Sequence, residues 1–244
     1  MNPDTRPQPS RESAQFAEQV QGMFGRVAKR YDLLNTVMTA GLHHSWRERA
    51  AHRAEVGPGD SVLDVCCGTG DLALELAGRV TPDGHVVGCD FSEPMLDLAR
   101  EKAAARGVAA ARFEWADALT LPYDAERFDA VTVGFGVRNL ADLDRGLREM
   151  SRVLRPGGRL VILEITQPAR PPLSFFFSLW FDRIVPLLGA FSDESEAYAY
   201  LPESVRSFPA PGKLAEMMDA AGFGQIRWTV LAGGIIAIHS GVRG

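Results

Sequence analysis

Hydrophobic positions between residues 61 and 165 form short continuous apolar runs, separated by longer segments in which apolar residues recur every three or four positions. The short runs are typical of buried strands, and the periodic segments are typical of helices that bury one face. Strands that alternate with helices at this spacing predict an α/β fold with a mostly parallel sheet and helices on both faces. Five strands are expected here, at residues 61–65, 86–90, 111–116, 128–133 and 160–165.

Two of the helices between these strands carry clear end signals. The helix after residue 90 begins at Ser92, a favoured N-cap residue, and has Pro94 in its first turn. The helix that contains Leu143 and Leu147 is expected to end at the Pro-Gly-Gly segment 156–158.

The segment before the first strand is predicted to be helical. Apolar residues recur at helical spacing in residues 14–37, with a break expected at Asp32–Asn35, and a second amphipathic helix is expected over residues 42–54. We interpret residues 13–58 as a helical lid over the open end of the sheet, where ligands of α/β folds bind. The alternative is a helix that only packs on the sheet. Residues 1–12 are polar and proline-rich and are expected to be disordered.

The chain after residue 165 departs from the alternating pattern. An aromatic-rich segment at 173–188 is expected to be helical and is followed by a polar segment at 195–207. A helix over residues 211–221 then precedes two final strands, at residues 225–231 and 235–240. We therefore expect a single domain over residues 13–244, closed by a hairpin, with an insertion at 168–210 that covers the substrate.

Composition narrows the classes of partner. The net charge is −5 and the sequence pI is about 5.6, whereas nucleic-acid binding needs a concentrated basic face, so no nucleic-acid partner is expected. Three cysteines, two of them adjacent, match neither a disulfide framework nor a metal-ligand spacing, so no metal is expected. No apolar leader or membrane-spanning run is visible, which favours a cytoplasmic location and leaves peripheral membrane contact open.

The most informative stretch is SVLDVCCGTGD, residues 61–71, a buried strand followed by a glycine turn and a helix. Gly68 and Gly70 allow a ligand to approach the backbone, and the free N–H groups of the new helix face that ligand. Asp90, at the end of the next strand, can accept hydrogen bonds from both hydroxyls of a ribose. These features indicate a cofactor that contains a nucleoside, and the spacing of the glycines also fits a dinucleotide.

Three features favour S-adenosylmethionine over a dinucleotide. Asp64 lies near the end of the first strand, where its carboxylate can receive the ammonium of an amino acid. Asp117 and Ala118 follow the third strand and can bind an adenine through side chain and backbone. A nicotinamide dinucleotide would also need a second glycine fingerprint, and the sequence contains none.

The motifs VLDVCCGTGDLALELA, VVGCDFSEPMLDLAR, ADALTLPYDAERFDAV and REMSRVLRPGGRLVILE resemble those of class I S-adenosylmethionine-dependent methyltransferases. More narrowly, YDLLNTVMTAGLHHSW, VGFGVRNL, YLPESVRSFP and LAGGIIAIHSG resemble the menaquinone/ubiquinone biosynthesis C-methyltransferase family. The resemblance runs from about Phe24 to Val242 and implies a Rossmann-like fold with a seven-stranded sheet. Mild departures from the family pattern occur at Leu34, Thr39, Gly134 and Thr166.

The resemblance implies C-methylation of a prenylated hydroquinone, most simply demethylmenaquinol to menaquinol, with S-adenosyl-L-methionine as co-substrate and no metal. The equivalent benzoquinol step of ubiquinone synthesis stays open, as does another lipophilic phenol, sterol or amine. A catalytically inactive binding partner in a quinone-biosynthesis assembly is the non-enzyme alternative. A homodimer is also left open.

Site residues follow from the matching motifs. The resemblance implies that Gly68, Thr69 and Gly70 contact the methionine portion, that Asp90 binds the ribose, and that Asp117 and Ala118 bind adenine. On the substrate side, Arg138 and Asn139 are the candidates, Arg138 as the group that stabilises a developing phenolate or acts on it through a water. Tyr31 and His43 in the lid are candidates to orient or deprotonate the phenol; a packing role for His43 and an ordinary salt bridge for Arg138 are the alternatives.

Overall fold

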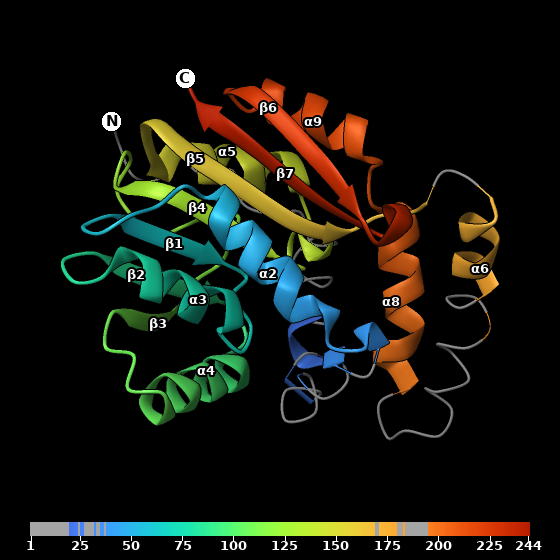
Figure 1. Cartoon of the computed structure of the whole chain (residues 1–244), viewed down its shortest axis with the longest axis horizontal. Coiled ribbons are helices and arrows are strands. Elements are labelled where there is room, and N and C mark those ends of the chain that lie inside the picture. Colours follow the sequence, from blue (N-terminus) through green and yellow to red (C-terminus); the bar gives the residue numbers. More distant parts are fainter. Residues whose placement is uncertain are drawn as a thin grey trace.

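The computed structural model describes residues 20–23, 25–26, 32, 35–36, 38–168, 171–179, 183 and 195–244. A seven-stranded sheet with the order β3-β2-β1-β4-β5-β7-β6 forms its centre (Figure 1). The strands are β1 (Ser61–Val65), β2 (His85–Asp90), β3 (Ala111–Trp115), β4 (Phe128–Gly134), β5 (Leu154–Ile165), β6 (Phe223–Leu231) and β7 (Ile236–Arg243). The α-helices are α2 (Leu42–Arg53), α3 (Asp71–Val80), α4 (Glu93–Ala105), α5 (Leu143–Val153), α6 (Leu173–Leu179), α8 (Ser195–Ser207) and α9 (Pro211–Ala220).

The sheet is parallel from β3 to β5 and antiparallel at its other edge. β1 pairs in parallel with β2 and with β4, so the carboxyl ends of these strands lie together. β7 pairs antiparallel with both β5 and β6, which confirms the closing hairpin. The strand order reverses between β1 and β4, and in open α/β sheets the crevice at this reversal is where ligands bind.

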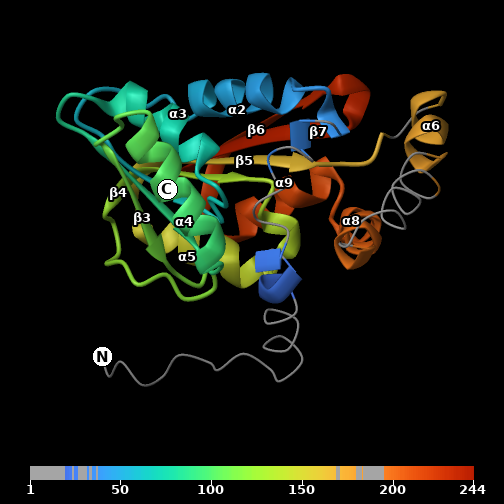
Figure 2. The same ribbon diagram turned by 90° about the horizontal axis from the view of Figure 1, so that it is seen from below.

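The alternation of side chains along each strand divides the core into two layers, one on each face of the sheet. On one face, Val62 of β1 packs with apolar residues of α2, α3 and α4. On the other face, Leu63 packs with residues of α5 and α9. Figure 2 shows α2 on one side of the sheet and α9 on the other, as the pattern of helices on both faces predicts.

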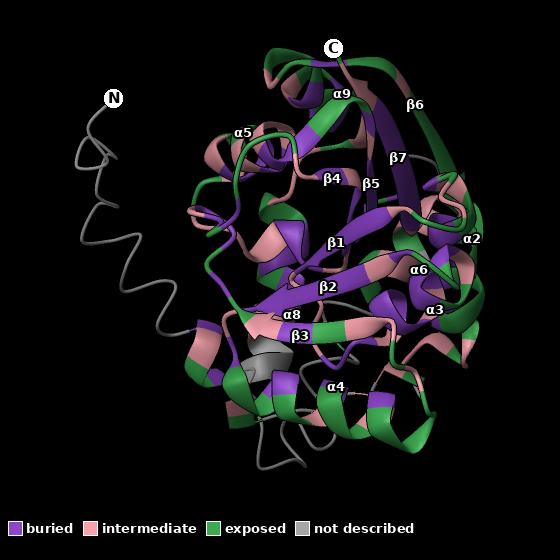
Figure 3. Cartoon of the chain, turned by 90° about the vertical axis from the view of Figure 1, so that its left-hand side faces the viewer, coloured by how far each residue is buried: buried purple, intermediate pink, exposed green. Residues whose placement is uncertain are grey.

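Burial differs sharply between the centre and the edge of the sheet. All five residues of β1 are buried, whereas β6 is mostly exposed (Figure 3). A central strand covered on both faces needs a continuous apolar run, and this is the pattern that made β1 easy to predict.

Some boundaries differ from the sequence expectation. The helix α5 ends at Val153, and β5 already starts at Leu154 rather than at residue 160. Leu154 pairs with Phe128, and the register then shifts before Arg159 pairs with Ala130, so the Pro-Gly-Gly segment is accommodated as an irregularity within the strand.

The predicted break at Asp32–Asn35 is wrong for the residues that the structure describes. Asp32 and Asn35 are helical, and the chain turns instead at Ala40 and Gly41. Gly41 has a φ of 76°, a left-handed conformation that favours glycine, and α2 begins at the next residue. The polar segment 195–207 is a helix, α8. Residues 1–12, Tyr31, Trp180 and Phe181 lie outside the described residues.

None of the described helices is both long and apolar enough to cross a bilayer.

Candidate active site

A cavity of about 290 Å³ opens at the carboxyl ends of β1, β2 and β4. It is lined by the glycine turn after β1 and by polar residues that follow the neighbouring strands. The predicted cofactor residues that line it are Gly68, Thr69, Asp64, Asp90, Asp117 and Ala118. The fold therefore brings together residues that are up to 54 positions apart in the sequence, because parallel strands end at the same edge of the sheet.

The turn between β1 and α3 requires glycine. Gly68 has a φ of 54° and Gly70 a φ of 81°. A Cβ atom on Gly70 would lie 2.8 Å from the ring of Phe113, so no side chain fits there. Gly70 is the N-cap residue of α3. The first residues of α3, Asp71 and Leu72, line the cavity. The N–H groups of the first helical turn, which have no partner within the helix, are therefore next to the cavity.

Asp90 lies at the end of β2, and both of its oxygens hold the adjacent backbone. Its Oδ2 accepts from the N–H of Gly68 at 2.9 Å, and its Oδ1 accepts from the N–H of Ser92 at 2.9 Å. A carboxylate oxygen can accept two hydrogen bonds, so each retains capacity for a ligand hydroxyl. Burial raises the pKa of Asp90 to about 6. Ser92 occupies the predicted N-cap position of α4, but its side chain makes no capping hydrogen bond.

Asp117 follows β3 and fixes a short turn. Its Oδ1 accepts from the N–H of Leu119 at 2.9 Å, while Asp117 and Ala118 line the cavity. The walls beside them are apolar or aromatic, and sequence reasoning did not identify them: Phe91, Met95 and Trp115. The indole N–H of Trp115 donates to the carbonyl of Phe91 at 2.9 Å, which fixes the orientation of this wall. Phe91 directly follows the predicted strand 86–90, which was an available signal, whereas Met95 and Trp115 had none.

Asp64 is a buried carboxyl that lines the cavity near the end of β1. Its Oδ1 accepts from the hydroxyl of Thr132 at 2.6 Å. Its Oδ2 is buried and has no hydrogen-bond partner among the described residues. Burial raises the pKa of Asp64 to about 7. An unsatisfied buried acceptor is costly, and a ligand ammonium would satisfy it.

The two cysteines Cys66 and Cys67 also line the cavity. Burial raises the pKa of both thiols well above the usual value, and the negative charge of Asp90 adds to this.

Arg138 and Asn139 lie in the short 3₁₀ helix η1 (Val137–Asn139), which follows β4. Arg138 forms a buried ion pair with Glu164 of β5 at 2.7 Å and donates to the carbonyl of Phe135 at 2.7 Å. Asn139 lines the cavity, and its Oδ1 accepts from the hydroxyl of Tyr200 at 3.1 Å. Arg138 is not among the described residues that line the cavity.

Tyr200, in α8, was not identified from the sequence. Its pKa is raised to about 12, mainly by burial, so the phenol is a stable donor at neutral pH. The hydrogen bond to Asn139 connects the insertion after β5 with the cavity.

His43 lies in α2 and is only 2 % exposed. Its Nδ1 bonds to the guanidinium of Arg47 and its Nε2 lies 3.1 Å from the hydroxyl of Thr36. Burial and the positive charge of Arg47 lower its pKa to about 4. The structure therefore places His43 behind Arg47, and it is not among the described residues that line the cavity. Tyr31, the second lid candidate, lies outside the described residues.

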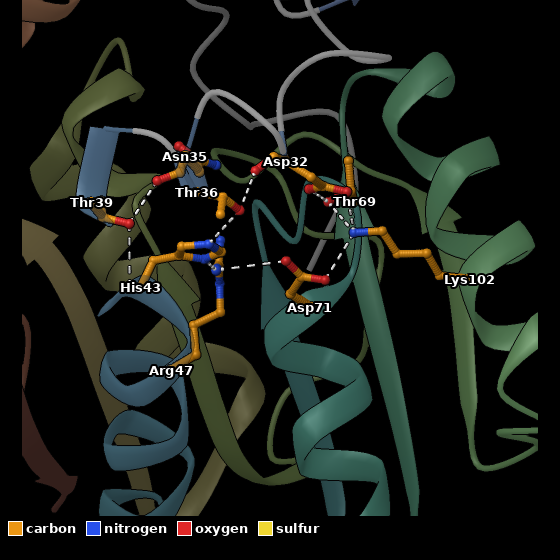
Figure 4. Close-up of polar contacts among 9 residues, drawn as sticks. All are labelled: Asp32, Asn35, Thr36, Thr39, His43, Arg47, Thr69, Asp71 and Lys102. Carbon is orange, nitrogen blue, oxygen red and sulfur yellow. Dashed lines mark hydrogen bonds and ion pairs between the residues drawn. The ribbon is translucent and has the colours of Figure 1, made fainter. Parts of the chain in front are cut away.

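A polar network connects the segment before β1 with the glycine turn (Figure 4). Thr69 donates to Asp32 at 2.7 Å and accepts from Lys102 at 2.8 Å. Lys102 also forms ion pairs with Asp32 at 2.6 Å and with Asp71 at 2.8 Å. Arg47 approaches Asp71 at 3.6 Å from α2. These contacts place Asp32 and Arg47 beside the glycine turn, while the interpretation of residues 13–58 as a substrate lid stays a prediction.

Within the described residues, no group of three or more His, Cys, Asp or Glu side chains is arranged to hold a metal ion.

Sequence comparisons identify similar proteins over nearly the whole chain. The model of the ubiE/COQ5 methyltransferase family matches residues 12–243. The demethylmenaquinone methyltransferase of Thermus thermophilus is 49% identical over 91% of this chain and 100% of its own length. That of Deinococcus radiodurans is 48% identical over 99% of both chains. The ubiquinone/menaquinone biosynthesis C-methyltransferase UbiE of Teredinibacter turnerae is 40% identical over 95% of this chain and 94% of its own length.

Solved structures share the fold at much lower sequence identity. A SAM-dependent methyltransferase from Aquifex aeolicus aligns with a TM-score of 0.61 at 18% identity, over 81% of this chain and 89% of its own. A SAM-dependent methyltransferase from Thermotoga maritima, described as a possible histamine N-methyltransferase, aligns with a TM-score of 0.64 at 16% identity, over 92% and 99%. These two likenesses concern the architecture of the sheet and its helices.

Proposed function

The chain belongs to the ubiE/COQ5 methyltransferase family, and we propose that it transfers a methyl group from S-adenosylmethionine to a ring carbon of demethylmenaquinol. Its use of S-adenosylmethionine agrees with the family and the fold. The observation that carries the choice of acceptor is the 48% identity, over 99% of both chains, with the demethylmenaquinone methyltransferase of Deinococcus radiodurans.

The cavity supports the binding of S-adenosylmethionine in an extended arrangement. Asp90 binds the ribose hydroxyls, Asp117 and Ala118 bind the adenine, and Gly68 and Thr69 contact the methionine portion. Gly70, which is not among the described lining residues, shapes the turn. The unsatisfied Oδ2 of Asp64 receives the ammonium. When bound, the donor supplies a methyl group already activated by a sulfonium, so the residues of this chain need to position the acceptor and exclude water.

The substrate side is formed by η1 and α8. Asn139 contacts the hydroquinone ring, and Tyr200 fixes the Asn139 amide by donating to its oxygen. A guanidinium does not lose its proton at neutral pH, so Arg138 is not a direct base. We assign Arg138 a positioning role in this proposal, because its ion pair with Glu164 holds η1 against β5. His43 supports Arg47 in the proposal and does not contact the phenol.

The proposal includes peripheral contact with a membrane, where a prenylated quinol is dissolved. The helix α6 exposes Phe175 by 67% and Leu179 by 42%, two apolar side chains one helical turn apart. Exposed apolar residues on a surface helix are suited to the boundary between water and lipid.

Methyl transfer to defined quinones tests the proposal directly. The purified protein would be incubated with S-adenosylmethionine labelled in its methyl group and with demethylmenaquinone, either reduced or oxidised. We expect label in the quinol fraction only for the reduced form, because a hydroquinone ring is nucleophilic and a quinone ring is not. The prenylated benzoquinol serves as the comparison substrate.

Each outcome discriminates between hypotheses. Label in the benzoquinol alone would assign the protein to the ubiquinone step instead. Turnover of another phenol, sterol or amine without any prenylated quinol would refute the choice of acceptor. Tight binding of S-adenosylmethionine with no methyl transfer to any quinol would support the inactive binding partner.

A further inference from the structure

The described residues that line the cavity carry four carboxyl groups but one cationic side chain. The carboxyl groups are those of Asp64, Asp71, Asp90 and Asp117, and the cation is Arg47. The side chain of Arg47 is 9% exposed, although it comes from α2, a helix that precedes the first strand of the sheet. A buried arginine in a cavity of this composition requires partners that hold it there.

Arg47 is held from three sides. Its Nη1 bonds to Nδ1 of His43 and lies 3.6 Å from Oδ2 of Asp71. Its guanidinium carbon lies 5.6 Å from the centre of the Phe135 ring, within the range of a cation–π contact. Phe135 follows β4 and also lines the cavity. These three contacts orient the guanidinium of Arg47. Among the described residues, it makes no short hydrogen bond to a carboxylate.

The hydrogen bonds of His43 can be assigned completely. A guanidinium only donates, so Nδ1 of His43 must accept from Arg47 and the neutral ring carries its proton on Nε2. This Nε2 donates to the hydroxyl of Thr36, which in turn donates to the carbonyl of Asp32 at 2.8 Å. His43 thus acts as a neutral support for the cation and adds no charge of its own.

The ion pair with Asp71 is loose because Asp71 is shared. Its Oδ1 accepts from Lys102 at 2.8 Å, whereas the 3.6 Å distance from Arg47 exceeds the usual hydrogen-bond length. Arg47 thus has five N–H donors and only one close acceptor, His43, among the described residues. A planar guanidinium in this state is suited to bind a further carboxylate with two parallel hydrogen bonds.

We propose that Arg47 binds the α-carboxylate of the methionine portion of S-adenosylmethionine. The methionine portion lies at the glycine turn, and Thr69 and Asp71 of that region line the same part of the cavity as Arg47. With Asp64 on the ammonium, the two charged groups of the amino acid meet side chains of opposite sign. The inference rests on the methyl donor of the proposed function and is independent of the acceptor.

The test uses two ligands that differ only in the carboxylate: S-adenosylmethionine and its decarboxylated form. Their dissociation constants would be measured by isothermal titration calorimetry for the native protein and for Arg47→Gln. Arg49→Gln, an exposed arginine on the same helix, is the matched control. Loss of a charge-assisted bidentate contact is expected to weaken S-adenosylmethionine binding by about tenfold or more. Binding of the decarboxylated ligand by Arg47→Gln should change by less than about threefold.

The test compares the ratio of the two dissociation constants within each variant, because this ratio does not depend on the fraction of folded protein. A ratio that changes in Arg47→Gln shows that Arg47 binds the carboxylate. Arg47→Lys is a second variant that keeps the charge and should keep an intermediate ratio. An equal loss for both ligands, or no loss for either, would overturn the inference. Failure of the native protein to bind S-adenosylmethionine would refute the methyl donor itself, whereas normal binding without methylation of a quinol would refute only the acceptor.

Discussion

Replacement of Asp90 by asparagine separates the proposed ligand-binding role of this residue from its structural role. The amide has nearly the same shape as the carboxyl group but has one acceptor oxygen and no charge. In the native protein both carboxyl oxygens of Asp90 accept backbone hydrogen bonds, at 2.9 Å from Gly68 and at 2.9 Å from Ser92. Both ribose hydroxyls are proposed to bind the same two oxygens.

The expected loss of binding follows from hydrogen bonds to a charged group. One such bond contributes about 1.5–3 kcal/mol, so loss of one ribose contact should raise the dissociation constant of S-adenosylhomocysteine about 10- to 150-fold. The stability of the free protein responds differently. Burial raises the pKa of Asp90 to about 6, so the ionised group destabilises the fold above that pH by roughly 3 kcal/mol. In Asp90→Asn, removal of this charge should stabilise the fold and so offset the free energy lost with one backbone hydrogen bond.

The measurement is therefore a pair of values at pH 7.5: the dissociation constant from calorimetry and the melting temperature without ligand. We expect a large rise in the first and little change in the second. Asp97→Asn in α4 is the control, because Asp97 is exposed and pairs only with Arg100 among the described residues. A dissociation constant for Asp90→Asn within twofold of the native value would show that the ribose does not bind here.

Three further changes test other parts of the site. Asp64→Asn should stabilise the ligand-free protein at pH 8, because burial raises the pKa of Asp64 to about 7. The gain in stability should shrink as the pH falls toward 4. Melting temperatures that show no such trend across this pH range would contradict the assignment. Arg138→Ala leaves Glu164 buried without its ion-pair partner, which should lower the free energy of unfolding by about 3–5 kcal/mol. Denaturant titrations measure this loss. An unchanged midpoint would show that the ion pair does not stabilise the fold. Tyr200→Phe should raise the KM for the quinol and leave the affinity for S-adenosylhomocysteine unchanged; the opposite pattern would place Tyr200 on the donor side.

Much of the fold could be predicted from local patterns. The strand β1 and the glycine turn appear as a short, mostly apolar run followed by two glycines, and the structure has both at the predicted positions. Asp90 and Asp117 could be placed at the cavity because Asp90 ends one predicted strand and Asp117 directly follows another, and parallel strands end at one edge.

Other parts of the site depend on contacts between distant residues. Arg47 is one of several polar residues on an amphipathic helix, and its burial results from the docking of α2 near Asp71, 24 positions further along the chain. The ion pair of Arg138 joins η1 to Glu164 in β5, 26 residues away. Neither pairing has a local signal. Met95 and Trp115 of the cavity wall belong to no charged or glycine motif, so only the fold reveals their place.

The half-buried cysteines Cys66 and Cys67 line the cavity proposed to bind an alkylating donor. A sulfonium methyl group reacts with any good nucleophile at the correct angle, and a thiolate is a far better nucleophile than a phenol-activated ring carbon. Burial and the charge of Asp90 raise the pKa of both cysteines, so each remains a protonated thiol at neutral pH. In the proposed donor site, we expect this protonated state to disfavour methylation of the two cysteines.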